Sequence, residues 1–337
     1  MREGSEMRIT DAAESFAQIR PDWLDLVEKN IHIISEHTFA GTEVGEVLAD
    51  AIGTRGKMIR PRLLLISGSF GPLFEERKDR LCMLAAMVEL THLASLIHDD
   101  IVDEAPMRRG VASIQGKYGK DAAVFAGDFL MSRINTFAFK NGLNESGETL
   151  TRTIEQMCIG EIGQARWRYR EDVSKEQYLQ NIQGKTTALF RSSCQIGAYE
   201  SGCSDEVAGR LKSIGEYLGI LFQLRDDLLD FTADTHSVGK ETHKDFRDGI
   251  YTMPVLMAMC DEAGRRELAP IIRKNRETVL GDSELQEMEE IVIARGGVER
   301  TKAEIRRYHQ KIYELLDNFN GQESAALLGA LVRKLEV

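Results

Sequence analysis

The stretch RLCMLAAMVELTHLASLIHDDIVDEAPMRRG, residues 80–110, is a long apolar segment that ends in four carboxylates and two arginines. Its apolar residues recur every three or four positions, which predicts one helix over residues 80–103. Asp99 and Asp103 then lie one helical turn apart and share a face. Two like charges at this spacing repel, and the C-terminal end of a helix disfavours anions. The cluster indicates either a solvated helix end or a site that holds a cation.

Helical periodicity dominates the rest of the chain, and alternating β-type segments are scarce. Further helices are predicted over residues 22–52, 61–70, 120–142, 148–168, 174–201, 204–231, 251–262, 264–274, 283–294 and 297–317. We therefore expect an all-α protein of about ten or more helices. No linker-like tract divides the chain, so we expect a single domain over residues 1–337, with residues 1–20 as a loosely attached extension. Residues 232–250 are polar and contain glycine, which is typical of a binding loop.

The overall composition is that of an ordinary globular protein. Hydrophobic residues make up 42% of the 337 positions, and the formal net charge is −11. This charge disfavours nucleic-acid binding. No run approaches about 18 consecutive apolar residues, so we expect no membrane span, and the N-terminus lacks the apolar core of a signal peptide. The five cysteines are scattered without a CxxC pair, so we expect a reduced, cytoplasmic protein without a zinc site or disulfides.

A second acidic cluster closes another predicted helix. The stretch FQLRDDLLDF, residues 222–231, supplies Asp226, Asp227 and Asp230. Two such clusters at the ends of buried helices could face each other inside a bundle, where metal sites are commonly built. Carboxylate oxygens with open positions suit Mg²⁺, which usually binds substrate phosphates as well. The repeated pattern therefore favours a site for Mg²⁺ and a diphosphate.

Four basic stretches could supply the cationic side of a diphosphate site. Lys57 and Arg60 precede a proline suited to the first turn of a helix, and helix N-termini bind anions. Arg108 and Arg109 follow the first acidic cluster, and guanidinium groups bind phosphate through two hydrogen bonds. The other candidates are Lys185, Thr186, Lys240 and, seven residues before Asp99, His92. Each alone is more often a surface charge or a core residue, but their placement beside the acidic clusters favours a binding role.

Together these motifs resemble those of a known family. The matching motifs are GKxxRP at 56–61, ELxHxASLxHDDxxDxxxxRRG at 89–110, AGDFLxSR at 126–133, GKT at 184–186, FQxxDDxxD at 222–230 and GK at 239–240. In these motifs the chain is similar to the trans-isoprenyl diphosphate synthases, in particular to polyprenyl diphosphate synthases of the medium- and long-chain type. The resemblance runs from about residue 50 to residue 260 and more faintly to the C-terminus.

The resemblance implies the isoprenoid synthase fold, an all-α bundle around a central cavity, and a prenyltransferase activity. Such enzymes elongate an allylic diphosphate, such as farnesyl diphosphate, by head-to-tail condensation with isopentenyl diphosphate. The allylic C–O bond ionises, the double bond of isopentenyl diphosphate attacks the carbocation, and a proton is lost to the released pyrophosphate. No protein nucleophile is required. The resemblance also implies Mg²⁺ as the cofactor, with three ions per active site, and a homodimer.

Residue roles follow from the resemblance, position by position. The catalytic residues would be Asp99, Asp100, Asp103, Arg108, Lys185, Asp226, Asp227 and Lys240. The direct Mg²⁺ ligands would be Asp99, Asp103 and Asp226, with Asp230, Asp100 and Asp227 acting directly or through water. The residues that hold isopentenyl diphosphate would be Lys57, Arg60, His92 and Arg109. The residues that hold the allylic diphosphate would be Arg108, Lys185, Thr186, Gln223 and Lys240.

Three positions bear on the product and on the assembly. Short-chain members carry bulky aromatic residues four and five positions before the first aspartate, where this chain has Ser95 and Ala94. Small side chains there leave room for the chain to grow, so we expect a product of about six to eight isoprene units, as in a quinone side chain. Ile250 stands where many members have a lysine. The large subunits of two-component synthases often lack that lysine too.

Several alternatives remain open. The chain could be the large catalytic subunit of a two-component synthase that is inactive without a small partner, or a shorter-chain farnesyl or geranylgeranyl synthase. A class I terpene cyclase shares the first acidic motif, but it has a different second motif and needs no isopentenyl diphosphate site. A non-catalytic partner subunit typically loses acidic positions, and none is lost here. A helical scaffold with solvated acidic ends would bind neither Mg²⁺ nor diphosphate.

Overall fold

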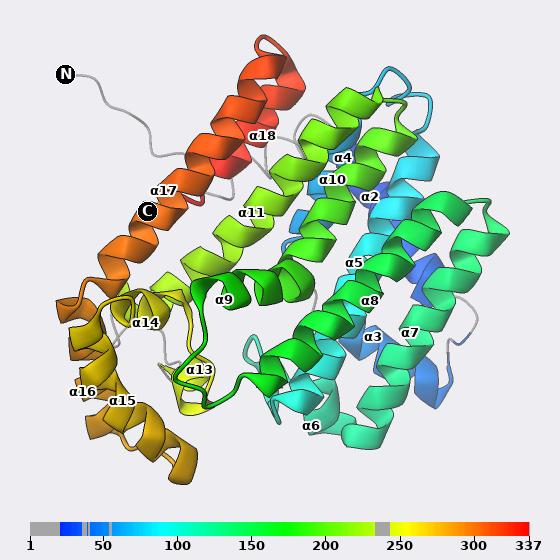
Figure 1. The fold of residues 1–337 in the computed structure, drawn as a ribbon. Coiled ribbons are helices and arrows are strands. Elements are labelled where there is room, and N and C mark those ends of the chain that lie inside the picture. Colours follow the sequence, from blue (N-terminus) through cyan, green and yellow to red (C-terminus); the bar gives the residue numbers. More distant parts are fainter. Residues whose placement is uncertain (1–20, 36–38, 40, 54–55, 233–242, 337) are drawn as a thin grey trace, which may run out of the picture. The chain divides into compact units, whose positions relative to one another are not determined.

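The computed structural model describes residues 21–35, 39, 41–53, 56–232 and 243–336. Within these ranges the chain is overwhelmingly helical, with more than ten α-helices and one two-stranded hairpin (Figure 1). The predicted all-α class is therefore confirmed. Lys240 and the predicted extension 1–20 lie outside the described residues.

The chain divides into two compact units, each assembled from separate segments. The first unit contains residues 1–154, 189–215 and 321–331, and the second contains residues 155–188, 216–320 and 332–337. Two helices, α8 (Asn144–Arg166) and α11 (Asp205–Thr232), begin in the first unit and end in the second. The expectation of a single domain over residues 1–337 stays a prediction.

The first unit is built around the helix that ends in the first acidic motif. Its α-helices are α2 (Pro21–Ser35), α3 (Glu43–Gly53), α4 (Ile59–Gly68), α5 (Lys78–Val102), α6 (Ile114–Tyr118), α7 (Lys120–Lys140), α10 (Ala188–Glu200) and most of α18 (Glu323–Arg333). Helix α5 packs against α2, α4 and α7 and is buried along most of its length (Figure 1). Helices that are apolar on all sides belong in a core. The first acidic motif therefore stands at the end of a core helix.

The second unit contains the remaining helices. They are α9 (Lys175–Ile182), α13 (Lys244–Arg247), α14 (Met253–Ala258), α15 (Glu262–Glu277), α16 (Asp282–Ala294) and α17 (Gly297–Leu316). A π-helical turn, η1 (Gln183–Thr187), joins α9 to α10, and a 3-10 turn, η2 (Asp317–Phe319), follows α17. All residues of α14 are buried, and the helix packs against α9, α16 and α17. Helix α14 therefore supplies much of the core of this unit.

The structure divides two predicted helices, those over 22–52 and 174–201, and adds elements that periodicity did not indicate. The helix predicted over 22–52 is wrong as one element, because it is interrupted between α2 and α3. At the break Gly41 takes a left-handed φ of +80°, and the Thr42 hydroxyl accepts a hydrogen bond from the Gly45 amide at 3.2 Å. Such a residue caps a new helix. The elements without a sequence prediction are α6, α13, α18 and a hairpin of β1 (Met107–Arg108) and β2 (Val111–Ala112).

Helix α5 is long and apolar enough to cross a membrane by length and composition, and it is the one such helix among the described residues. However, 72% of its most apolar stretch is buried inside the structure. A core helix of a globular protein meets the same criteria. The apolar character of α5 is explained by its packing inside the first unit.

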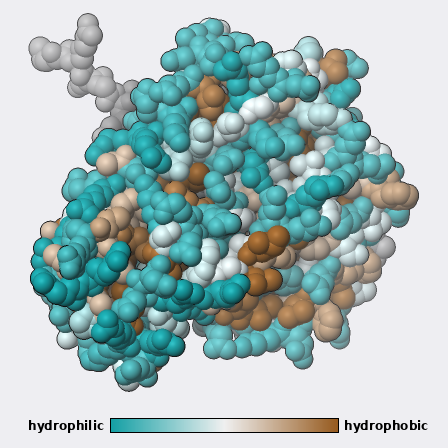
Figure 2. Space-filling view, viewed as in Figure 1, coloured by the Kyte–Doolittle hydropathy of each residue, from teal (hydrophilic) through white to brown (hydrophobic). Residues whose placement is uncertain are grey.

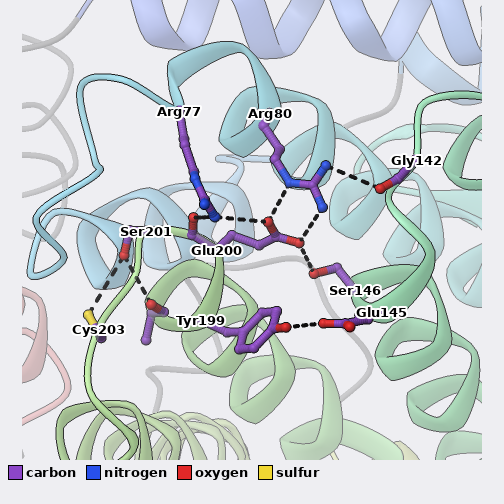
Figure 3. A network of polar contacts seen from close by, with 10 residues as sticks. Arg77, Arg80, Gly142, Glu145, Ser146, Tyr199, Glu200, Ser201 and Cys203 are labelled. Carbon is purple, nitrogen blue, oxygen red and sulfur yellow. Dashed lines mark hydrogen bonds and ion pairs between the residues drawn. The ribbon is translucent and has the colours of Figure 1, made fainter.

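A buried carboxylate, that of Glu200, holds the start of α5 against the end of α10 and the start of α8 (Figure 3). Its oxygens accept hydrogen bonds from the Arg80 guanidinium and from the Ser146 hydroxyl. Arg77 Nη1 donates to the Glu200 carbonyl at 2.8 Å and lies 4.0 Å from the carboxylate. The Glu200 side chain is only 1% exposed. This network therefore fixes the N-terminal end of the helix whose other end carries the first acidic motif.

Candidate active site

Helix α5 places the first acidic motif at its C-terminal end. The helix ends at Val102, and the Asp103 amide donates a hydrogen bond to the Asp99 carbonyl at 2.8 Å. Asp99 and Asp103 therefore lie one turn apart on one face. Asp103 is exposed and Asp99 is half-buried. Both are placed where a ligand at the end of the helix can be reached.

A tight hairpin follows the motif. Strands β1 and β2 pair antiparallel, with Arg108 opposite Val111. The two residues of the turn, Arg109 and Gly110, both have positive φ, at 51° and 82°. Positive φ at both central positions defines the type I′ turn, which matches the twist of a two-residue hairpin. One of the two arginines thus lies in a strand and the other in the turn.

Arg108 turns toward the acidic motif and binds Asp100. Its Nε lies 2.8 and 2.9 Å from the two carboxylate oxygens, and its Nη2 lies 2.6 Å from one of them. Asp100 is 4% exposed. The side-chain amide of Gln115 donates to the Ala105 carbonyl at 3.0 Å. The backbone amide of Ala105 donates to the Asp100 carbonyl at 2.9 Å, which holds the chain between α5 and the hairpin in place. The Asp100 carboxylate is therefore bound to Arg108 at the base of the hairpin.

Arg109 turns the other way and lies over Gly56. A Cβ atom at position 56 would come within 2.6 Å of both terminal nitrogens of the Arg109 guanidinium. Glycine permits this approach because it has no side chain. The exposed Lys57 follows on the same segment, which leads into α4. Two consecutive arginines therefore have different partners on different elements.

The structure brings Arg60, His92 and Arg109 close enough to interact electrostatically. Burial lowers the pKa of Arg60 to about 10, and while Glu89 opposes this shift, Arg109 adds to it. Burial is the main cause that lowers the pKa of His92 well below its ordinary value, and the positive charges of Arg60 and Arg109 lower it further. The ring is therefore neutral at neutral pH. Arg60 Nε has no hydrogen-bond partner, although its guanidinium stacks on an aromatic ring. A buried donor of this kind is suited to an anion.

Replacing Gly56 tests this arrangement directly. We expect Gly56→Ala to raise the KM for isopentenyl diphosphate about tenfold, equivalent to roughly 1.4 kcal/mol, because the new Cβ displaces the Arg109 guanidinium. The KM for the allylic diphosphate and the unfolding midpoint should stay unchanged, since a flexible side chain can move aside. Steady-state kinetics with each substrate varied in turn measure this difference.

Gly53→Ala is the matched control, because a Cβ atom at position 53 would meet nothing within 4 Å. An equal rise in both KM values for Gly56→Ala would contradict the assignment of Arg109 to one substrate.

In the second unit the GKT motif lies in the π-helical turn η1. Lys185 Nζ lies 3.0 Å from Glu161 Oε1 and 3.0 Å from Gln164 Oε1, both on α8. The Thr186 hydroxyl donates to Gln223 Oε1 on α11 at 2.8 Å. Isolated π turns occur frequently at functional sites. Two adjacent motif residues are therefore held by two different helices.

Close backbone contacts hold this turn between α8 and α11. A Cβ atom on Gly160 of α8 would lie 2.6 Å from the Lys185 amide nitrogen, and one on Gly219 of α11 would lie 2.7 Å from Thr187 Cα. Neither backbone atom can move aside without shifting the turn. Glycine at both positions therefore lets three helical segments meet at the GKT motif.

Asp227 of the second acidic motif is buried and serves as a hydrogen-bond acceptor. It accepts from the Tyr178 hydroxyl, from Gln223 Nε2 at 3.0 Å and from the Met253 amide at 3.1 Å. Burial raises the pKa of Asp227 to about 7, against the lowering effect of these three donors. Because Gln223 also accepts from Thr186, a continuous chain of hydrogen bonds links the GKT motif to the second acidic motif.

Asp226 and Asp230 lie one turn apart near the end of α11. Asp226 is exposed and Asp230 is half-buried. Asp230 Oδ1 accepts a hydrogen bond from the His243 amide at 3.0 Å, and His243 Nε2 lies 3.3 Å from Glu289 Oε2. Burial lowers the pKa of His243, but its contacts with Asp230 and Glu289 outweigh this effect and raise the pKa above its ordinary value.

The residues assigned to product length lie on α5, before the first acidic motif. Ala94 is fully buried, and Ser95 is half-buried with its hydroxyl donating to the His92 carbonyl at 2.8 Å. Ser95 therefore turns its small polar group back onto the helix. Both side chains are small, which is the property on which the prediction of a long product rests.

Ile250 lines a cavity in the second unit of roughly 350 Å³, open mouth included. Trp167, Tyr178 and Gln164 also line it. Tyr178 donates to Asp227 and Gln164 accepts from Lys185, so the cavity borders the partners of two predicted site residues. An apolar residue therefore stands where a lysine would add charge to this region.

Comparison with known proteins decides the family. The family model described as "Polyprenyl synthetase" matches residues 42–288. The chain belongs to the polyprenyl synthetase family. The predicted resemblance to the trans-isoprenyl diphosphate synthases is confirmed, and so is the predicted enzyme class, a trans-prenyltransferase.

Relatives of the chain are medium- and long-chain synthases. Heptaprenyl diphosphate synthase component 2 of Geobacillus stearothermophilus is 34% identical over 288 residues, which cover 85% of this chain and 87% of the relative. Octaprenyl diphosphate synthase of Escherichia coli (strain K12) is 34% identical over 247 residues, which cover 73% and 75%. The structure of a polyprenyl synthase of Caulobacter crescentus CB15, complexed with calcium and isoprenyl diphosphate, matches with a TM-score of 0.86 at 26% identity, covering 96% of this chain and 97% of that chain. The isoprenoid synthase fold is therefore confirmed.

Members of this family generally depend on Mg²⁺, and the residues present fit this ion. Among the described residues, no three His, Cys, Asp or Glu side chains form a complete metal cluster. Each acidic motif instead offers carboxylates one turn apart, Asp99 with Asp103 and Asp226 with Asp230. Mg²⁺ prefers oxygen ligands and is usually bound by one or two carboxylates together with substrate phosphates. The donor set therefore suits a metal that binds with a diphosphate.

Four residues of this region were missed by the sequence prediction. They are Glu161, Gln164, Tyr178 and His243. Tyr178 carried a weak signal, because it lies seven residues before Lys185, about two helical turns. The others touch their partners through tertiary packing, which helical periodicity does not report.

Proposed function

We propose that this chain elongates an allylic diphosphate with isopentenyl diphosphate, using the residues of its two acidic motifs and the basic side chains near them. The observation that carries the proposal is the divergence of two consecutive arginines. Arg108 binds Asp100 at the first acidic motif, while Arg109 lies over Gly56 and interacts with Arg60 and His92. One tight hairpin thus serves two anion sites, which a two-substrate reaction requires.

Isopentenyl diphosphate is assigned to the first of these sites. Its diphosphate would be held by Lys57, Arg60, His92 and Arg109. The structure supports this assignment with the half-buried Arg60, whose buried Nε has no hydrogen-bond partner, and with a neutral His92 that can donate without adding charge. Arg109, in the turn, supplies an exposed second guanidinium.

The allylic diphosphate is assigned to residues of both motifs. It would be held by Arg108, Lys185, Thr186 and Gln223, together with Lys240, which lies outside the described residues. The π turn supports this assignment because it presents Lys185 and Thr186 side by side on a backbone fixed between α8 and α11. Arg and Lys side chains next to a departing diphosphate stabilise the charge that develops on it.

Mg²⁺ would be held by Asp99, Asp103, Asp226 and Asp230, with three ions per active site. When bound, these ions neutralise negative charge on the diphosphate and make it a better leaving group. Asp100 and Asp227 would position the motifs rather than complete the ion shell, because both are buried and already accept several hydrogen bonds.

The reaction itself needs no protein nucleophile. The allylic C–O bond breaks, the double bond of isopentenyl diphosphate forms the new C–C bond, and a proton passes to the released diphosphate. The chain contributes by holding both diphosphates in place and by excluding water from the allylic cation. We propose a product of about six to eight isoprene units, because Ala94 and Ser95 leave space below the first acidic motif.

Incubation of the purified chain with Mg²⁺, farnesyl diphosphate and labelled isopentenyl diphosphate tests the proposal. We expect labelled products longer than about twenty carbons. Products that stop at fifteen or twenty carbons would support a farnesyl or geranylgeranyl synthase instead and overturn the assignment of Ala94 and Ser95. A cyclic product would indicate a terpene cyclase.

Ala94→Phe should shorten the product. Position 94 lies five residues before Asp99, about 7.5 Å along the helix axis, so an aromatic ring there should stop growth at about four isoprene units, one condensation beyond the farnesyl primer. Chromatography of the labelled products measures the change. Ala85→Phe, at another fully buried alanine nearer the start of α5, is the control for overpacking alone. An unchanged length distribution with Ala94→Phe would contradict the tunnel assignment.

A second candidate is the large subunit of a two-component synthase. Two observations favour this candidate. Ile250 lines the cavity described above at the position where many family members have a lysine, so that positive charge is absent here. One relative is named as component 2 of a heptaprenyl diphosphate synthase. This candidate predicts that the chain alone binds Mg²⁺ and diphosphate but makes no product. A non-catalytic partner subunit would bind neither.

We propose a cytoplasmic homodimer as the basal assembly. Polar side chains cover most of the face shown in Figure 2, with apolar groups between them. In the first unit, α7 exposes two large aromatic residues, Phe125 at 70% and Phe139 at 79%. Exposed aromatic side chains of this kind are enriched at protein–protein contacts. Sedimentation of the purified chain distinguishes a homodimer from a monomer that awaits a different partner.

A further inference from the structure

His243 is a buried residue that the proposed chemistry does not use. Its side chain is 3% exposed, and its ring packs on Phe231 with centroids 4.9 Å apart. Its backbone takes a left-handed conformation, with φ at 59° and ψ at 28°. Residues other than glycine rarely adopt this backbone conformation, and at functional sites the surrounding contacts hold them in it. The contacts of His243 are therefore the features that keep its backbone in this conformation.

The imidazole ring lies between two carboxylates from different helices. Nδ1 lies 3.5 Å from Asp230 Oδ2 at the end of α11, and Nε2 lies 3.3 Å from Glu289 Oε2 on α16. The His243 amide also donates to Asp230 Oδ1 at 3.0 Å. His243 thus joins the end of α11 to α16 through Asp230 and Glu289.

Asp230 belongs to a crowded acidic motif. Asp226, Asp227 and Asp230 all stand within five residues of α11, and carboxylates one turn apart on a helix repel. A carboxylate has about four lone-pair positions, of which His243 faces two at Asp230. His243 therefore contacts both oxygens of the Asp230 carboxylate, which restricts the orientation of that carboxylate.

We propose that His243 is a positioning residue for the second acidic motif: held by Glu289, it fixes the Asp230 carboxylate in the orientation in which the motif binds Mg²⁺ with a diphosphate. This inference rests on the proposed function. Residues that orient a metal ligand in this way typically change metal affinity by about 10- to 100-fold when they are removed. His243 would act through Asp230 and need not touch the substrate.

Three substitutions separate the two sides of the ring. His243→Gly removes the side chain and suits the left-handed backbone. His243→Asn keeps a donor near the position of Nδ1, facing Asp230, and Asn also tolerates this backbone. His243→Gln keeps a donor near the position of Nε2, facing Glu289. If Asp230 is the group being positioned, the Asn variant should recover function and the Gln variant should not.

The test is calorimetric titration of the full-length chain with Mg²⁺ and inorganic diphosphate, which requires no turnover. We expect His243→Gly and His243→Gln to weaken binding about tenfold or more, and His243→Asn to stay within about threefold of the unmodified chain. Glu289→Gln should weaken binding in the same direction. Glu290→Gln is the matched control on α16, because Glu290 accepts only from Gln286 among the described contacts.

Wild-type affinity in His243→Gly would overturn the proposal, and so would equal losses in the Asn and Gly variants. Circular dichroism and the unfolding midpoint of each variant separate misfolding from positioning, since a loss of binding that tracks a loss of folding in all three variants also overturns it. A wild-type chain that makes polyprenyl product alongside an unaffected His243→Gly would remove the positioning role and leave the proposed function intact. A wild-type chain without product and without Mg²⁺–diphosphate binding would remove both.

Discussion

Asp103→Asn is expected to lower kcat for prenyl transfer by about 100- to 1000-fold while leaving the protein as stable as before or slightly more stable. The activity should fall because the substitution removes a carboxylate from the proposed Mg²⁺ shell, where the leaving diphosphate gains charge. The stability should not fall, because Asp103 caps the C-terminal end of α5, where the helix dipole disfavours a negative charge. We expect the free energy of unfolding to rise by at most about 0.5 kcal/mol.

Glu104→Gln is the matched control for this experiment. Glu104 is the next residue, is exposed and pairs with Lys120 at 2.6 Å. Its replacement should leave kcat within about twofold, since exposed ion pairs contribute little. Steady-state kinetics across a Mg²⁺ series and denaturant unfolding supply both readouts. A loss of activity that is equal in the two variants would show that total charge, rather than the position of the carboxylate, matters at this end of α5.

Glu200→Ala is expected to have the largest effect on stability. Its buried carboxylate pairs with the partly exposed Arg77 and Arg80 and with the buried Ser146, so truncation leaves the Ser146 hydroxyl without its acceptor and both guanidinium groups without their carboxylate (Figure 3). Water can solvate the two arginines that remain, so the loss is expected to be about 1–3 kcal/mol, the cost of removing the partner of a buried polar group. We expect a decrease of this size in the free energy of unfolding, measured by denaturant titration. Residual folded protein should keep its KM values, because the network lies at the opposite end of α5 from the first acidic motif.

Two further variants make this prediction decisive. Glu145→Ala removes an exposed carboxylate of the same region that accepts only the Tyr199 hydroxyl among the contacts shown in Figure 3, and it should cost less than about 1 kcal/mol. Glu200→Gln keeps an acceptor for Ser146 and should fold even if Glu200→Ala does not, with an intermediate loss. Equal stability of Glu200→Gln and the unmodified chain would show that the charge of Glu200 contributes nothing to folding.

The sequence predicted the elements that carry the acidic motifs, because long helices with strong periodicity leave a clear pattern. Helix α5 was predicted over 80–103 and is observed over Lys78–Val102, and α11 was predicted over 204–231 and is observed over Asp205–Thr232. Helix ends are marked where polar residues follow an apolar run, and both acidic motifs sit at such ends. The placement of Asp99 and Asp226 near helix C-termini therefore followed from the pattern alone.

Other features depend on contacts that no local pattern reports. The π turn at Gln183–Thr187 lies inside a stretch predicted as one continuous helix, since its apolar spacing is close to that of an α-helix. The burial of Asp227 beside Tyr178 depends on how α9 packs on α11. The contact between His243 and Glu289 joins residues 46 positions apart through tertiary structure. Motif resemblance named the residues that would touch substrate, but it did not indicate those that hold them.

The turn at Arg109 has a consequence for how this protein can change in evolution. A side chain at positive φ in a type I′ turn is strained relative to glycine or asparagine, by roughly 1 kcal/mol. Selection for stability alone would therefore replace Arg109 by one of those residues. Under the proposed role of Arg109 in holding isopentenyl diphosphate, its cation is kept by selection for catalysis, and the position is a stability–activity trade-off confined to a single residue. The same proposal predicts that a library selected for thermostability without substrate becomes enriched in chains that fold better and bind isopentenyl diphosphate less well.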